Sequence, residues 1–120
     1  MSELNHTTLK QIAGHLAGLV GKLPEPFVTF NKQKASYDFK FGEIDCTLGK
    51  ETCSAPAQQP PWISYEIIAS HGGSLYTASV NVWIRNPSSD IEVNREGLKR
   101  ALEKFRDTPG TIMIDYDLNQ

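Results

Sequence analysis

The stretch that decides the fold is WISYEIIASHGGSLYTASVNVWI, residues 62–84. On both sides of a central HGGS, residues 71–74, apolar side chains alternate with mostly polar ones. A period of two is typical of strands that bury one face, and glycine supplies the positive φ angles of a tight turn. The stretch therefore predicts a β-hairpin. Its predicted buried face carries Ile63, Tyr65, Ile67 and Ala69 from the first strand and Tyr76, Ala78, Val80, Val82 and Ile84 from the second.

Two amphipathic helices are predicted, one on each side of the hairpin. Residues 8–22 repeat apolar side chains with a helical period, and Thr8 and Gln11 have the spacing of a capping box. The second helix starts at Ser89 or at Asn94 and ends at residues 108–110, Thr-Pro-Gly. Its predicted apolar face carries Leu98, Ala101, Leu102 and Phe105.

Three further strands are predicted outside the hairpin. Residues 27–30 are rich in strand-forming side chains, and in residues 37–41 aromatic and charged side chains alternate. Gly42 breaks that alternation, and Ile44 and Cys46 continue it out of phase, which predicts a bulge or a bend at Gly42. The last strand is expected over residues 111–118, with Asp115 and Asp117 on its polar side.

Residues 48–61 are predicted to form an exposed, proline-rich arm. Three of these residues are prolines, and few side chains in the segment are suited to burial. So long a loop in so short a chain is either functional or a mobile spacer. The element order is thus α-β-β-β-β-α-β, which predicts a single α+β domain over residues 1–120, a two-layer sandwich of two helices on a mainly antiparallel sheet.

The composition narrows the classes of function. The chain has 12 basic and 14 acidic side chains, without the basic excess of a protein held to nucleic acid by its charge. No apolar run is long enough to span a bilayer, and the N-terminal residues lack the pattern of a signal peptide. We therefore expect a cytoplasmic protein with no nucleic-acid or membrane partner, in which Cys46 and Cys53 are reduced thiols; a disulfide between them is the alternative if the protein is secreted by another route.

Two groups of residues suggest metal chemistry, and each has a simpler explanation. Asp38-Phe39-Lys40 has the acid-x-Lys form of the PD-(D/E)xK nucleases, with Glu25 as a second candidate metal ligand. A strand whose solvent-facing positions carry charged residues, alternating with apolar ones, also produces the pattern Asp-x-Lys. Asp115 and Asp117, together with Glu66 or Asp45, form a candidate site for a hard cation, although acids on an exposed strand face are commonly just solvated.

No nucleophile elbow or phosphate-binding loop is present, so we expect no enzyme, no cofactor and no bound metal. The candidate interaction residues lie instead on the polar face of the hairpin. Trp83 and Trp62 are large apolar side chains on that face, which is typical of a contact surface. Leu75, Pro60 and Pro61 are expected to extend the surface. Alternatively, the two prolines cover Trp62 within the same chain.

From Pro60 onward the chain resembles the tail-terminator proteins of tailed bacteriophages. The resemblance covers about half the chain and rests on Pro61-Trp62-Ile63-Ser64-Tyr65, on the strand over residues 76–84 and on the helix over residues 96–105. It implies a small α+β protein that forms a ring, often hexameric, which caps the tail tube and joins it to the head. It implies no catalytic residues.

The leading hypothesis is therefore a non-enzymatic assembly protein that self-associates and contacts other proteins, and that is virion-associated if the resemblance holds. The alternative is a small inhibitor or toxin-immunity-type binding protein. The third hypothesis is the metal-dependent nuclease.

Overall fold

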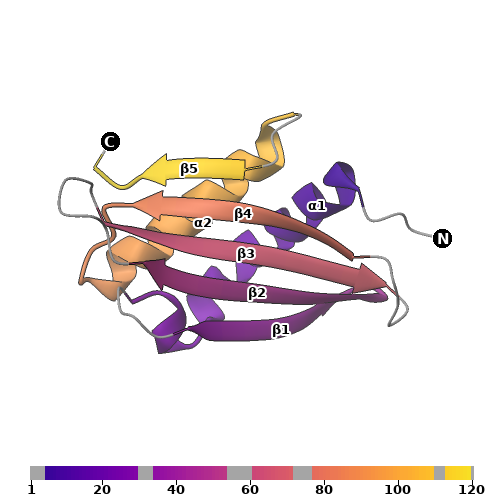
Figure 1. Ribbon diagram of the computed structural model, residues 1–120, viewed down its shortest axis with the longest axis horizontal. Helices are drawn as coiled ribbons and strands as arrows, with labels where there is room; N and C mark the ends of the chain where they lie inside the picture. The colour runs from indigo at the N-terminus through magenta and orange to yellow at the C-terminus, as the bar shows by residue number, and fades with distance from the viewer. Residues whose placement is uncertain (1–4, 30–33, 54–60, 72–76, 110–112, 120) are drawn as a thin grey trace.

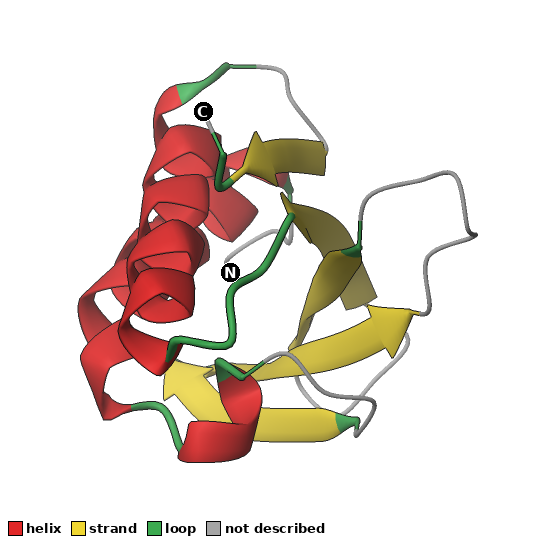
Figure 2. Ribbon diagram, turned by 90° about the vertical axis from the view of Figure 1, so that its left-hand side faces the viewer, coloured by secondary structure: helices red, strands yellow, loops and turns green. Residues whose placement is uncertain are grey.

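Five strands form one sheet, and two helices cover one of its faces (Figures 1 and 2). The computed structural model describes residues 5–29, 34–53, 61–71, 77–109 and 113–119. In chain order the elements are α1 His6–Leu19, the 3₁₀ turns η1 Val20–Lys22 and η2 Glu25–Phe27, β1 Ala35–Phe41, β2 Ile44–Cys53, β3 Trp62–His71, β4 Thr77–Arg85, α2 Ile91–Asp107 and β5 Met113–Asp117. The predicted α+β class and the two-layer arrangement are confirmed.

The sheet order follows the chain, β1-β2-β3-β4-β5, so the first four strands form an antiparallel meander. The last strand, β5, lies parallel to β4. Parallel neighbours need a crossover connection, and α2 supplies it. The sheet therefore has two free edges at opposite ends, β1 and β5 (Figure 1).

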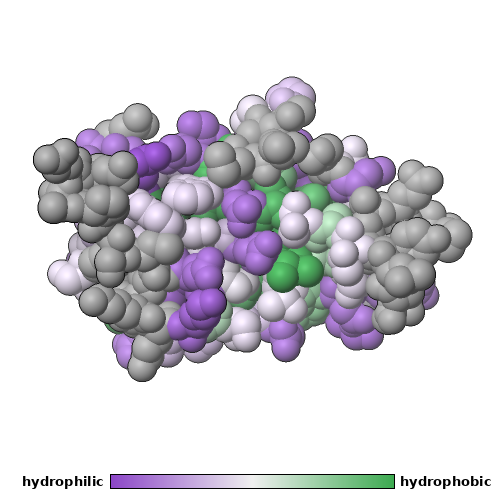
Figure 3. All heavy atoms as spheres, viewed as in Figure 1, coloured by the Kyte–Doolittle hydropathy of each residue, from purple (hydrophilic) through white to green (hydrophobic). Residues whose placement is uncertain are grey.

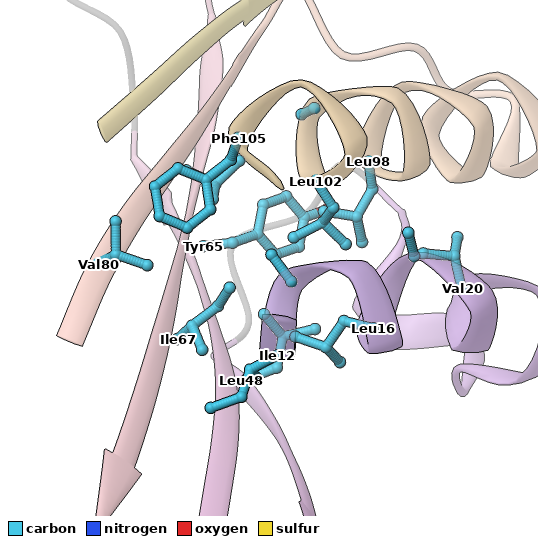
Figure 4. Packing of buried hydrophobic residues seen from close by; sticks show 14 of the residues in the cluster. Ile12, Leu16, Val20, Leu48, Tyr65, Ile67, Val80, Leu98, Leu102 and Phe105 are labelled. Atoms are coloured by element: carbon cyan, nitrogen blue, oxygen red, sulfur yellow. The ribbon is translucent and has the colours of Figure 1, made fainter. Parts of the chain in front are cut away.

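The predicted hairpin is present as β3 and β4, with Ile63, Tyr65 and Ile67 paired to Ile84, Val82 and Val80. All six side chains are buried. The predicted turn glycines and Tyr76 lie outside the described residues. The core forms where this hairpin meets the helices, and Figure 4 shows side chains of α1, α2 and the sheet pointing into one cluster. The labelled residues are Ile12, Leu16, Val20, Leu48, Tyr65, Ile67, Val80, Leu98, Leu102 and Phe105.

The strand predicted over residues 27–30 is wrong. Glu25–Phe27 form the turn η2, and Phe27 and Val28 are fully buried. Prolines at 24 and 26 fix φ near the value of a turn and remove the N–H groups that a strand would donate. The apolar residues of this segment are therefore buried in the core although its backbone is not extended. Phe30 lies outside the described residues.

The strand predicted over residues 37–41 is confirmed within β1, but the bulge or bend at Gly42 is a hairpin turn. Gly42 has a φ of +62°, which glycine adopts without strain, and Phe41 pairs directly with Ile44. The change of phase in the sequence marks a change of strand. The next strand, β2, continues to Cys53, so the first six residues of the predicted arm are sheet. Residues 54–60 of that arm lie outside the described residues.

Both helix starts differ from the predicted ones. The side chain of Asn5 accepts a hydrogen bond from the Thr8 backbone N–H at 3.0 Å and caps α1, in place of the predicted capping box. Asp90 accepts from the Glu92 N–H at 3.0 Å and caps α2, in place of Ser89 or Asn94. Short polar side chains follow one another before each helix, and the local sequence does not distinguish which one is the cap.

The two helices run antiparallel, and each receives a cation from the other at its C-terminal end. Lys10 of α1 donates to the carbonyl oxygen of Phe105 at 2.7 Å and to that of Thr108. Arg95 of α2 donates to the carbonyl oxygens of Val20 at 2.6 Å and Leu23 at 2.9 Å. The last carbonyls of a helix lack intrahelical partners, so these contacts both satisfy them and oppose the helix dipole.

We predict that Arg95→Met lowers the free energy of unfolding by about 2 kcal/mol, because hydrogen bonds from a charged donor contribute roughly 1.5–3 kcal/mol. Urea denaturation monitored by circular dichroism measures the change. The matched control is Arg100→Met on the same helix, since Arg100 is exposed and, among the described residues, forms its ion pair with Glu96. Its expected effect is below about 0.5 kcal/mol. Equal losses in both variants would show that the Arg95 contacts do not stabilise the helix pair.

The connection between the helix layer and β1, residues 20–29, is also held from the sheet. Lys50 lies on the core face of β2, is 2% exposed, and donates to the carbonyl oxygens of Pro26 and of Thr29, the latter at 2.9 Å. The hydroxyl of Tyr65, its neighbour on β3, donates to the carbonyl of Phe27 at 3.1 Å. This segment makes few backbone hydrogen bonds of its own, so side chains supply the donors.

Candidate functional site

The sheet face opposite the helices, called here the open face, carries the candidate interaction residues. No described helix covers it, and Figure 3 views it directly, with hydrophilic side chains around a smaller hydrophobic area near the middle. Side chains on this face alternate with the core residues along each strand. They include Ser36, Asp38 and Lys40 of β1, Asp45, Thr47, Gly49 and Glu51 of β2, Trp62, Ser64, Glu66 and Ile68 of β3, Ser79, Asn81, Trp83 and Arg85 of β4, and Asp115 and Asp117 of β5.

Trp62 and Trp83 contact one another on the open face. Their ring centroids lie 4.3 Å apart, the rings are inclined by 36°, and both side chains are half-buried. In the β3–β4 register Trp83 pairs with Ser64 and Trp62 pairs with Arg85, so the indoles are diagonal neighbours. The predicted position of both tryptophans on the polar face of the hairpin is confirmed. Their role in contacts remains a prediction.

The indole N–H of Trp83 is buried and has no hydrogen-bond acceptor among the described residues. A buried indole N–H usually finds a partner, and an unmade hydrogen bond there is unfavourable. Pro61 directly precedes Trp62 in the chain and is half-buried. Its backbone carbonyl accepts a hydrogen bond from the Asn86 N–H at 2.8 Å. The other two predicted interaction residues, Pro60 and Leu75, lie outside the described residues.

A polar hollow of about 530 Å³ lies beside the tryptophan pair. We call it the Gly49 trough; its lining includes Ser36, Gly49, Glu51, Ser64, Glu66 and Asn81, from four adjacent strands. One row of cross-strand neighbours runs along it, from Ser36 to Gly49 to Glu66 to Asn81. The next row places Ser64 opposite Trp83, so the trough and the pair form one continuous surface.

The candidate nuclease residues are not brought together. Asp38 accepts a hydrogen bond from the Thr47 hydroxyl at 2.8 Å, and Lys40 lies 3.4 Å from Asp45, all on the open face. Glu25 belongs to η2, on the helix side of the sheet, where Phe27 packs against Tyr37 with ring centroids 6.4 Å apart. The proposed metal ligands are therefore separated by the sheet.

Asp115 and Asp117, the candidate cation ligands of the last strand, each contact a neighbouring polar side chain. Asp115 forms an ion pair with Arg85 at 2.7 Å, and the Asn86 amide donates to Asp117 at 2.8 Å. That hydrogen bond lowers the pKa of the Asp117 carboxyl, with a smaller contribution from the Asn119 N–H. Within the described parts of the chain, no three His, Cys, Asp or Glu side chains are grouped so that they could hold a metal ion.

The two cysteines cannot form a disulfide within one folded chain. Cys46 and Cys53 both belong to β2. Seven residues of extended strand separate their Cα atoms by about 23 Å, whereas a disulfide requires less than roughly 7 Å. Burial raises the pKa of the Cys46 thiol to about 11, so this thiol stays protonated at neutral pH.

The sequence prediction missed Gly49 and Lys50, because both fell within the predicted arm. The signal that was available is the alternation of Ile44, Cys46 and Leu48, which predicts a strand that runs on past residue 48. The prolines later in the segment favour a loop, and for this reason the sequence predicts an arm over the whole of residues 48–61. The structure shows that β2 ends only at Cys53, before the first of these prolines.

Comparisons with known proteins identify no relative of this chain, since no family model, no curated protein and no solved structure matches it. No helix among the described residues has the length and apolar character needed to cross a membrane.

Proposed function

We propose that this chain is a non-enzymatic assembly protein with a role like that of a phage tail terminator. In this proposal identical copies join through the edges of their sheets, and the open face binds a second protein, such as the protein of a tail tube. The observation that carries the proposal is the Trp62–Trp83 pair on a sheet face that no described helix covers.

Tryptophan is enriched among the residues that dominate the energy of protein–protein contacts, because it buries a large rigid surface and keeps one polar group. The buried indole N–H of Trp83, which has no acceptor among the described residues, supports the same role, since an acceptor on a partner would satisfy it. Polar side chains around the pair provide the hydrogen-bonding rim that such an interface needs.

The edges of the sheet support self-association. Strand β1 has seven residues and β5 has five, and among the described strands each has a neighbour on one side. An unpaired edge presents backbone N–H and C=O groups that can pair with another chain. Because the two edges differ and lie at opposite ends of the sheet, joining β1 of one copy to β5 of the next is a head-to-tail contact. Such contacts close into rings when the rotation between copies permits.

We predict that mass photometry finds an oligomer of two or more chains, with a mass that is a whole-number multiple of the 13.4 kDa of one chain. Asp38→Lys places a second lysine beside Lys40 on the β1 edge and should shift the protein toward monomer, because charge on an edge opposes pairing. The matched control is Ser79→Lys, on the same face of strand β4, which is not an edge strand because it pairs with both β3 and β5; this variant should leave the oligomer intact.

A wild-type chain that stays monomeric at its highest soluble concentration would contradict the self-association. A monomer that captured one enzyme in a one-to-one complex would fit the alternative of an inhibitor or toxin-immunity-type protein.

A further inference from the structure

We infer that the Gly49 trough is a binding site for an extended, basic segment of the protein partner, with an arginine or lysine side chain placed against Glu66. The inference rests on the proposed function, because it gives the chemistry of the partner that the open face would bind. It is carried by three observations on the trough: an open floor, walls of polar side chains that have no partner among the described residues, and a carboxylate, Glu66, that none of those residues neutralises.

The floor is open because residue 49 is glycine. A Cβ atom built at Gly49 would meet only the backbone oxygen of Glu66, at 3.9 Å, which is ordinary van der Waals contact. A larger side chain would therefore fit, and glycine inside a strand is unfavourable compared with residues that have a side chain. Neither backbone conformation nor close packing requires glycine here. Glycine in a strand interior commonly marks a place where a ligand or another backbone approaches.

The walls consist of hydrogen-bonding side chains that are not used inside the molecule. The side chains of Ser36, Ser64, Glu66 and Asn81 make no hydrogen bond or ion pair with any described residue. Ser64 is only 8% exposed and lies among the lining residues of the trough. Its hydroxyl is not one of the buried polar atoms without a partner among the described residues, so water reaches it in the free protein, and a polar group of a bound ligand would replace that water.

The charge of the trough selects a cation. Two carboxylates line it, but Lys34 forms an ion pair with Glu51 at 2.9 Å and compensates that charge. Glu66 has no such partner among the described residues. The guanidinium of arginine suits this position best, because its planar donors can bind a carboxylate in pairs and also reach neutral oxygens such as those of Ser64 and Asn81.

The length of the trough favours a peptide segment over a single ion. The row from Ser36 to Asn81 crosses three spacings between adjacent strands, or about 14 Å, which is the span of about four extended residues. The Trp62–Trp83 pair lies beside the end of this row, because Trp83 follows Asn81 by two residues on the same face of β4. The same partner would then use both parts of the open face.

Titration of the ¹⁵N-labelled protein with the capped tripeptide acetyl-Ser-Arg-Ser-amide, followed by NMR, tests the inference. The expected result is a saturable shift of the amides of Gly49, Ser64 and Glu66 and of the Trp83 indole N–H. The same peptide with citrulline in place of arginine has nearly the same shape without the charge. It should bind at least tenfold more weakly.

Two variants and one control separate binding from folding. Gly49→Val fills the trough with a strand-forming side chain, so it should abolish the response while thermal stability stays equal or rises. Glu66→Gln removes the charge and should weaken arginine-peptide binding at least tenfold. Glu43→Gln changes an exposed carboxylate in the β1–β2 turn, away from the trough, and should bind as the wild type does.

Equal binding of the citrulline peptide, or a wild-type response in Gly49→Val, would overturn the inference. If the edge-dependent oligomer and Trp83-dependent binding persisted at the same time, the proposed function would stand without this site. If Gly49→Val converted the oligomer to monomer, the occupant would be another copy of the chain, and the assignment to a separate partner would be wrong.

Discussion

Replacing Lys50 by methionine is expected to lower the free energy of unfolding by about 2–3 kcal/mol, the range for charge-assisted hydrogen bonds whose acceptors stay buried. Methionine keeps the apolar length of the side chain but removes the ammonium group. The carbonyls of Pro26 and Thr29 then lose that donor. Chemical denaturation followed by tryptophan fluorescence measures the loss.

The effect should be large because Lys50 is one of three side chains that hold residues 20–29. Arg95 of α2 holds the start of this connection, Tyr65 of β3 its middle and Lys50 of β2 its end. Phe27 and Val28 in the same segment are fully buried in the core. Releasing the segment would therefore expose apolar surface in addition to breaking hydrogen bonds.

The pH dependence of stability provides a second signature of Lys50. Burial lowers the pKa of this lysine below its ordinary value of 10.5, so the unfolded chain binds more protons than the folded one at pH values just below 10.5. The contribution of Lys50 to stability therefore rises with pH through that window. Burial also raises the pKa of Tyr65, which lowers stability above about pH 10, but this effect is common to both proteins.

The stability difference between the wild type and Lys50→Met should accordingly widen as the pH rises toward 10.5. The matched control is Lys40→Met on the neighbouring strand β1, because the Lys40 side chain is 71% exposed and its ion pair within the described part of the chain is with exposed Asp45. Its expected loss is below about 0.5 kcal/mol, with no added pH dependence. A Lys50→Met protein as stable as the wild type at neutral pH would show that the carbonyls do not need this donor.

Under the proposed function, Trp83→Ala is expected to weaken binding of the proposed partner, a tail-tube protein, about 30-fold or more, the loss that defines an energetic hot spot. Its cost to folding should stay below the roughly 3–5 kcal/mol of a core tryptophan, because Trp83 is only partly buried, although it loses both apolar contact area and the aromatic pair. The difference arises because Trp83 packs on Trp62 at the open face and not in the helix-covered core. Biolayer interferometry on tail-tube protein and a thermal melt of the free chain measure the two effects.

Two further variants define what Trp83 contributes. Trp83→Phe keeps the aromatic surface and removes the indole N–H, so an intermediate loss of affinity is expected if a partner accepts from that group. Ile68→Ala is the matched control, because Ile68 is a large apolar side chain, 36% exposed, on the same face but outside the pair. If Trp83→Ala unfolded the domain, Trp83 would be a core residue, and the contact hypothesis would lose its main support.

The second half of the chain was predictable because its patterns are local. Alternation in residues 62–84 determines which side chains of β3 and β4 reach the core, and a one-residue shift would expose all of them. The helical spacing of Leu98, Ala101, Leu102 and Phe105 likewise determines the buried face of α2. From these patterns the positions of Trp62 and Trp83 on the opposite face followed directly.

By itself, therefore, the sequence determined the class of the fold, the hairpin, the two helical faces and the position of the tryptophan pair on the face opposite the core. Tertiary structure alone decided the rest. Phe27 and Val28 are buried in a turn because side chains from three other elements supply its hydrogen bonds. Lys50 is buried because backbone carbonyls distant in the chain lie beside it, and Gly49 forms a trough because four strands align their polar neighbours around it. Neither environment leaves a periodic signal, since each depends on residues brought together only by folding.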